Sequence, residues 1–208
     1  MDPLSATRPR EASAAKALSE SASEGLTSVG LVSLCHGDFG AAIDELRAHV
    51  QREPEDQAAW TLLARAQWLA GDADPALGST RRVLRLRADD DAAHRLQCRI
   101  LLSLERYDEA LAAAARAGDV VTDAAWVPSM RAEALLGLER YEEAAKAYEA
   151  AILRDPTSHQ AWLGKGLAER GRGERSAASA ALRASASIAL PSGEPTADWA
   201  RRAADAES

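Results

Sequence analysis

The 208-residue sequence has few aromatic side chains, few cysteines and no long apolar run. Aromatic residues make up only 4% of the chain whereas alanine occurs 48 times, so the core must consist of small and aliphatic side chains that pack closely. This composition favours packed helices over a sheet sandwich. With 47% hydrophobic and 27% charged residues, the chain has the balance of a globular protein rather than a disordered one.

These shortages also disfavour several classes of protein. No run approaches the roughly 18 apolar residues of a membrane span, and the N-terminus has no apolar stretch of signal-peptide length, so we expect a cytoplasmic protein without membrane insertion. Cys35 and Cys98 are widely separated and form no CxxC motif, which is neither a disulfide framework nor a zinc pattern. The net charge of -7 argues against nucleic acid as a partner.

The chain repeats itself with a period of 34 residues. LERYDEA at residues 104–110 recurs as LERYEEA at residues 138–144. Counting from Ser23 gives five blocks without gaps: 23–56, 57–90, 91–124, 125–158 and 159–192. The eighth and twentieth places of every block hold small residues: Gly30, Ala64, Cys98, Ala132, Gly166, and Ala42, Ala76, Ala110, Ala144, Ala178. The small residues predict close approach of two helices within each block.

Each block reads as two helices separated by a short break such as AGD at residues 70–72. Asp74 followed by Pro75 predicts an N-cap and a first helical residue. Pro128 lies near the start of the first helix in its block and would remove a hydrogen bond unless that helix begins late. In block 91–124 the second helix is expected to stop near Ala117, because no closing proline follows it.

The columns of this alignment resemble the tetratricopeptide repeat. Trp60 and Trp162 share the fourth place, Pro54 and Pro156 share the thirty-second, and an aromatic residue recurs at the seventeenth. The resemblance covers residues 23–192 and implies an all-α fold, a right-handed α-solenoid of five tandem helix-turn-helix repeats. Residues 1–22 are expected to form a flexible arm, and residues 193–208 a C-terminal capping helix with Trp199 covering the last repeat.

The resemblance also implies a function, because the family serves mainly as a protein-binding scaffold. In such a stack the first helices line a concave surface. The second, fifth, ninth and twelfth places of a block share one side of the first helix, which we call the first-helix stripe. Its candidate partner-binding residues are Arg65, Trp68, Arg95, Arg99, Trp126, Glu133, Gln160 and Arg170.

The first-helix stripe predicts a partner with both acidic and apolar residues, either extended or helical. Arginine offers a planar donor fork to carboxylates, and tryptophan is a common binding anchor. Two alternatives stay open: Arg99 pairs with Glu133 in the next block, and the tryptophans are half-buried packing residues. A different function is also open, in which the chain is a structural homo-oligomer whose groove holds its own N-terminal arm or a second copy.

One binding mode of the family is not matched. Some members hold the acidic tails of heat-shock chaperones with lysine and asparagine side chains that clamp two carboxylates. No three consecutive blocks of this chain reproduce that arrangement. A chaperone-tail adaptor is therefore disfavoured.

No set of residues predicts catalysis, a cofactor or a metal ion. His94 and Cys98 stand four residues apart on one helix but fall in core-facing places, so packing explains them better than metal binding. Cys35 and His36 are adjacent and lack an orienting third group, and His49 has no evident partner. The sequence contains no phosphate-binding loop, nucleophile elbow or metalloprotease motif. We therefore expect a protein that is not an enzyme.

The basic segment STRRVLRLR at residues 79–87 has two interpretations. Its four arginines are spread around a second helix, which is typical of a solvated outer face. Alternatively, this basic face contacts the acidic first block. Both interpretations place the segment outside the first-helix stripe.

Overall fold

A computed structural model describes residues 37–121, 125–189 and 202–205. Every regular element in these residues is helical, and they contain no strand. No described helix is long and apolar enough to cross a membrane. The expected arm at residues 1–22, the first helix of block 23–56 and Trp199 of the expected cap lie outside the described residues.

The helices recur with the predicted period. They are α3 (Phe39–Arg52), α4 (Gln57–Ala70), α5 (Ala73–Leu86), α6 (Asp91–Ser103), α7 (Tyr107–Val120), α8 (Val127–Gly137), α9 (Tyr141–Arg154), α10 (His159–Gly171) and α11 (Arg175–Ala189). The second helices α3, α5, α7, α9 and α11 begin at residues 39, 73, 107, 141 and 175, each 34 residues after the last. The expected all-α fold of tandem helix pairs is therefore confirmed.

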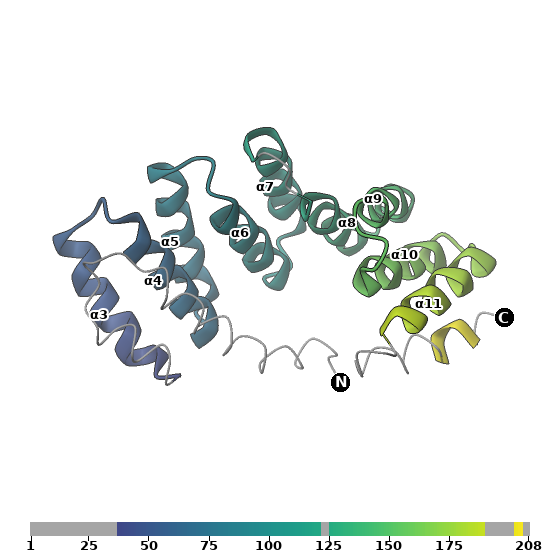
Figure 1. The fold of residues 1–208 in the computed structure, drawn as a ribbon, viewed down its shortest axis with the longest axis horizontal. Coiled ribbons are helices and arrows are strands. Elements are labelled where there is room, and N and C mark those ends of the chain that lie inside the picture. The colour runs from purple at the N-terminus through teal and green to yellow at the C-terminus, as the bar shows by residue number, and fades with distance from the viewer. Residues whose placement is uncertain (1–36, 122–124, 190–201, 206–208) are drawn as a thin grey trace. The chain divides into compact units, whose positions relative to one another are not determined.

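The chain forms two compact units, Met1–Ile100 and Leu101–Ser208. In the first unit α4 packs against both α3 and α5 (Figure 1). Short loops connect these helices, so neighbours run antiparallel. The core cluster between α3 and α4 comprises Ala42, Ile43, Leu46, Val50, Ala59, Leu62, Leu63 and Ala66, with Phe39 and Trp60 packed against it.

In the second unit each helix from α7 to α11 packs against the next one along the chain, and α8 also contacts α10. The central cluster comprises Ala132, Leu135, Ala144, Ala145, Tyr148, Ala151, Ala161 and Ala168. Residues 202–205 are helical, and Ala204 is fully buried. The Ser179 hydroxyl of α11 donates to the Ala204 carbonyl over 3.2 Å, so this part of the C-terminal segment packs on the last repeat.

The small columns of the alignment are buried as predicted. All five alanines of the twentieth place are at most 1% exposed. Ala64, Cys98 and Ala132 of the eighth place are equally enclosed, and a Cβ on Gly166 would overlap Leu182. Helices that meet at alanine and glycine come close enough to bury a continuous core without large aromatic residues.

Three predicted helix ends need correction or comment. Helix α5 begins at Ala73 with Asp72 as its N-cap, so Asp74 is not the cap and Pro75 is the third helical residue. Proline is tolerated there because the first four N–H groups of a helix have no intrahelical acceptor. Helix α7 continues past Ala117 to Val120, so the predicted end was too early. Helix α8 does begin late, which places Pro128 in its first turn.

Candidate functional site

The first-helix stripe lies at the surface of both units. Four places in each of the four blocks from residue 57 onward give sixteen positions, all within the described ranges, and none of the sixteen is buried. The eighth place, on the neighbouring side of the same helices, is buried in each of them. The helix period therefore separates a core-facing column from a stripe that reaches solvent.

In the first unit the stripe is basic. Arg65 and Trp68 on α4 are half-buried, whereas Arg95 and Arg99 on α6 are exposed. Arg95 pairs with Asp91 one turn earlier over 3.1 Å, and both side chains are about half exposed. An exposed pair of this kind holds an arginine only weakly. The stripe positions of α4 and α6 include three arginines and no acidic residue.

In the second unit the stripe is mixed in charge and partly apolar. Glu133, Gln160 and Arg170 are exposed. Half-buried leucines occupy other stripe positions of this unit: Leu102, Leu136, Leu163 and Leu167. This part of the stripe combines apolar surface with one charge of each sign.

Trp126 does not lie on a helix, although the sequence places it on one. It is the N-cap of α8, because that helix begins only at Val127. Its side chain is half-buried. Trp126 therefore belongs to the turn that enters α8.

Tyr148 on α9 has a buried hydroxyl whose pKa is raised by its surroundings, including Glu133 of the first-helix stripe. Its side chain is 3% exposed and lies against Gly164, where a Cβ would overlap the ring. Burial raises the pKa of Tyr148 far above its usual value, and the negative charge of Glu133 adds to this effect. Tyr148 is therefore a packing residue that stays neutral.

A hydrogen bond that the sequence did not reveal recurs at the fourth place of the blocks. Trp60 and Trp162 each donate an indole N–H to the carbonyl six residues earlier, at Pro54 and Pro156, over 2.9 Å. His94 Nε2 lies 2.8 Å from the Ala88 carbonyl, which is also six residues earlier. A carbonyl only accepts, so His94 Nε2 carries the proton. In blocks 57–90, 91–124 and 159–192 the fourth place thus ties the first helix to the turn before it, whereas block 125–158 has Pro128 there.

His94 and Cys98 are packing residues, as the sequence predicts. His94 is 5% exposed and is held by the Ala88 carbonyl, and Cys98 is fully buried. Within the described residues, Cys98 forms no disulfide bond. Neither residue belongs to a group of potential metal ligands in the described part of the chain.

The expectation that His49 lacks a partner is wrong. His49 Nε2 lies 2.8 Å from Asp56 Oδ2, and both side chains are largely buried. Asp56 is also the N-cap of α4, where its Oδ1 accepts the N–H of Ala59 over 3.0 Å. Burial opposes ionisation of this carboxyl, but the Ala59 N–H and His49 together lower the pKa of Asp56 below its usual value.

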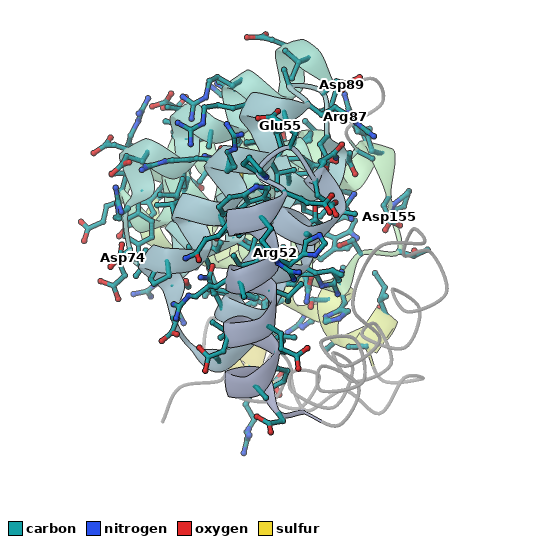
Figure 2. The ribbon with its side chains drawn as sticks, turned by 90° about the vertical axis from the view of Figure 1, so that its left-hand side faces the viewer. Arg52, Glu55, Asp74, Arg87, Asp89 and Asp155 are labelled. Atoms are coloured by element: carbon teal, nitrogen blue, oxygen red, sulfur yellow. The ribbon has the colours of Figure 1, made fainter. Side chains whose placement is uncertain are left out.

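The arginines of segment 79–87 fall into two groups, one exposed to solvent and one in contact with the first block. Arg81 and Arg85 on α5 are exposed to solvent. Arg82 instead contacts the first block, where it donates to Glu55 Oε1 over 2.6 Å and to the Pro54 carbonyl over 2.9 Å. Figure 2 shows Arg87 and Asp89 just after the end of this helix, where Arg87 Nε lies 3.5 Å from Asp89 Oδ1.

Two family models match the chain, and both are described as tetratricopeptide repeats. They match residues 34–100 and residues 129–195, which together are more than half of the sequence. The chain belongs to the tetratricopeptide repeat family. No curated protein matches this repeat protein in sequence.

Solved structures of other repeat proteins share its fold. A crystal structure of MamA superposes with a TM-score of 0.73 at 20% identity, covering 80% of this chain and 98% of MamA. A MamA fragment from Desulfovibrio magneticus RS-1 gives 0.66 at 19% identity, covering 84% and 92%. YrrB, described as a TPR protein with an unusual peptide-binding site, gives 0.69 at 15% identity, covering 90% and 96%. At these identities the similarity establishes the tetratricopeptide fold and nothing finer.

Proposed function

We propose that this tetratricopeptide repeat protein is a non-catalytic scaffold that binds a segment of another protein along the first-helix stripe. The observation that carries the proposal is the stripe itself, which reaches solvent at every described position. YrrB supports the proposal as a protein of the same fold with a peptide-binding site. The expected cytoplasmic location suits a chain with two cysteines and no disulfide framework in its sequence.

The charge of the stripe favours a partner that is both acidic and apolar. Arg65, Arg95 and Arg99 offer guanidinium groups in the first unit, where carboxylates of the partner would be attracted. Trp68 adds an amphipathic anchor among them. In the second unit the half-buried leucines would cover apolar side chains of the partner, whereas Glu133 and Arg170 would orient polar ones.

The proposal is tested by affinity capture from the native cell with quantitative mass spectrometry. The test protein carries Trp126→Ala and Arg99→Glu on the stripe. A matched control carries Arg85→Glu and Leu153→Ala, which make the same charge change and remove an apolar side chain from exposed outer positions. We expect partners of the wild type to be lost with the stripe variant and retained with the control.

Equal recovery of the same partners by both variants would show that the stripe is not the binding surface. A recovered partner is then reduced to its bound segment, and a synthetic peptide of that segment is titrated against both variants. Sedimentation of the wild type addresses the structural alternative. A stable dimer that dissociates with the stripe variant would favour self-association over a separate partner.

A further inference from the structure

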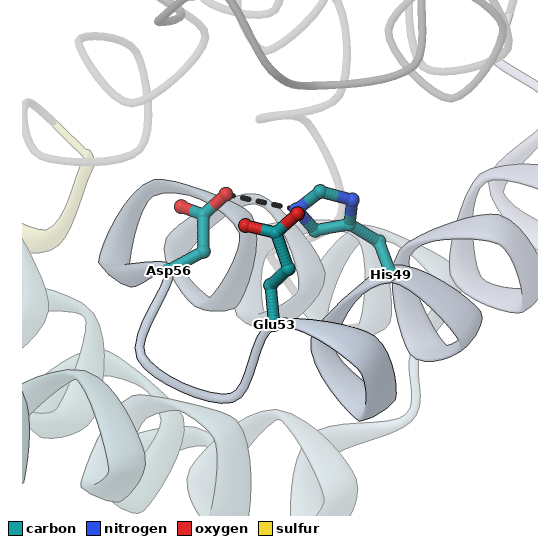
Figure 3. A group of neighbouring side chains, drawn as sticks. All are labelled: His49, Glu53 and Asp56. Atoms are coloured by element: carbon teal, nitrogen blue, oxygen red, sulfur yellow. Dashed lines mark hydrogen bonds and ion pairs between the residues drawn. The ribbon is translucent and has the colours of Figure 1, made fainter.

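The turn between α3 and α4 gathers one imidazole and two carboxylates. His49 lies in the last turn of α3, Glu53 is the C-cap of that helix, and Asp56 is the N-cap of α4. Each offers a donor atom, and these atoms lie within 4.8 Å of one another. Figure 3 shows the Glu53 carboxylate turned toward the hydrogen bond between His49 and Asp56. We propose that His49, Glu53 and Asp56 bind a divalent transition-metal ion of the zinc class.

Packing of the repeat does not require a histidine at this position. The places equivalent to His49 hold the buried apolar residues Val83, Ala117 and Ala151 in the next three blocks, and in the last block Ser185, which donates to the His159 carbonyl over 2.8 Å. The following turn forms without one, because Gln57 donates to the N-cap Asp90 over 2.6 Å. A buried imidazole is costly unless its nitrogen is used. His49 uses its Nε2 in the hydrogen bond to Asp56, and these same two atoms are donor atoms that an ion could bind.

The charges of the group favour a cation. Two carboxylates flank one imidazole, so a divalent ion would neutralise the charge of the two carboxylates. The C-terminal end of α3 adds partial negative charge from its last carbonyl groups. Mixed imidazole and carboxylate ligands suit zinc and its neighbours rather than calcium or magnesium.

The geometry requires only a small adjustment. Zinc bonds of about 2.0–2.2 Å would separate two tetrahedral ligands by about 3.4 Å. His49 Nε2 and Asp56 Oδ2 are 2.8 Å apart, so the metal would replace the proton between them and widen the gap by about 0.6 Å. Asp56 Oδ1 would keep its bond to the Ala59 N–H, which holds the ligand in place. Glu53 is exposed, so its side chain would move toward the ion to bind it. A water molecule would take the remaining coordination position on the solvent side.

Such an ion would lock the first described helix to the second repeat. All three ligands come from eight consecutive residues across one turn. Binding would stabilise the folded turn because the unfolded chain does not hold the donors together. The proposed site lies outside the first-helix stripe, so it stands independently of the scaffold function.

Zinc binding by the full chain is measured by calorimetry, and cobalt is used as a spectroscopic probe. We expect one ion per chain and a higher thermal unfolding midpoint with zinc. Glu53→Gln is the decisive variant, because it removes a ligand and leaves the hydrogen bond between His49 and Asp56. It should weaken zinc binding at least about tenfold. Glu55→Gln is the matched control, with the same charge change two residues away, and should bind as the wild type does.

Several results would overturn the proposal. These are no measurable zinc binding, equal affinity in Glu53→Gln and Glu55→Gln, or a cobalt spectrum with a thiolate charge-transfer band. His49→Gln and Asp56→Asn extend the test, since asparagine still caps a helix. Circular dichroism of each variant shows whether α3 and α4 remain folded. A folded His49→Gln variant that binds zinc like the wild type would also contradict the site.

Discussion

The ring of Tyr107 lies so close to Gly137 that a Cβ on the glycine would overlap it. Tyr107 opens the second helix of one repeat, and Gly137 ends the first helix of the next. The same contact recurs one period later between Tyr141 and Gly171. The aromatic residue of the seventeenth place therefore packs on the following repeat, where glycine leaves room for its ring.

The first prediction concerns the methyl group that Gly137 lacks. Gly137→Ala should lower the free energy of unfolding by about 1–3 kcal/mol, because the added Cβ forces the half-buried Tyr107 ring to move. Urea unfolding followed by circular dichroism measures the loss. In a Tyr107→Ala background the same substitution should cost much less, and additive effects of the two changes would contradict the contact.

Gly78 is the matched control for that experiment. It lies inside α5 and is exposed, and a Cβ there would meet no atom within 4 Å. Gly78→Ala should raise the free energy of unfolding by about 0.5–1 kcal/mol, because alanine is the better helix former. If both substitutions act in the same direction, the contact between Tyr107 and Gly137 does not decide the result.

The second prediction concerns stability in alkaline solution. Because burial raises the pKa of Tyr148, the folded chain keeps this proton above pH 10 whereas the unfolded chain loses it. The folded state then binds more protons, so the free energy of unfolding should fall with rising pH by up to about 1.4 kcal/mol per unit. Tyr148→Phe should remove this part of the slope. Unfolding midpoints of the two proteins between pH 8 and pH 11, together with tyrosinate absorbance, provide the measurement.

The third prediction compares two tryptophans with the same hydrogen bond. Trp162→Phe should cost about 1 kcal/mol, because phenylalanine keeps the ring but lacks the N–H that reaches the Pro156 carbonyl. Trp60→Phe should cost less, because the Pro54 carbonyl also accepts from Arg82. Thermal unfolding of the two single variants tests the order. A larger loss for Trp60→Phe would show that packing of the ring, rather than its N–H, sets the difference.

The fourth prediction concerns the buried thiol of Cys98 in α6. Cys98 is fully buried, so it should react with a bulky disulfide reagent only when the repeat opens. In a Cys35→Ser background, the reaction should be slow in buffer and immediate in denaturant. Rapid labelling of the folded protein would contradict the packing interpretation of His94 and Cys98.

Most of the fold could be predicted from the sequence, because the residue pattern of a helix pair recurs in several blocks. Small residues at fixed places, such as Ala110 and Ala144, predicted which faces of the helices would meet. The helix ends were less certain, because they depend on local capping. Asp72 rather than Asp74 occupies the N-cap position of α5, and α7 runs three residues beyond Ala117.

The side-chain partners could not be predicted in the same way. The sequence placed Trp126 on a helix, left His49 without a partner and gave no hydrogen bond for Trp60 or Trp162. Hydrogen-bond partners depend on the path of the backbone through each turn, and periodicity carries no information about that path. A spacing of six residues between Trp162 and Pro156 becomes a contact only because the turn folds back.

The sequence by itself determined the period, the helix pairs and the columns of small residues, because each is a local or repeated property of the chain. The tertiary structure decided which atoms meet across the turns. It placed the carboxylate of Asp56 near His49 and Glu53, and it packed the ring of Tyr107 against Gly137 of the next repeat. Helix periodicity follows from local backbone geometry, whereas these contacts exist only after the helices have packed.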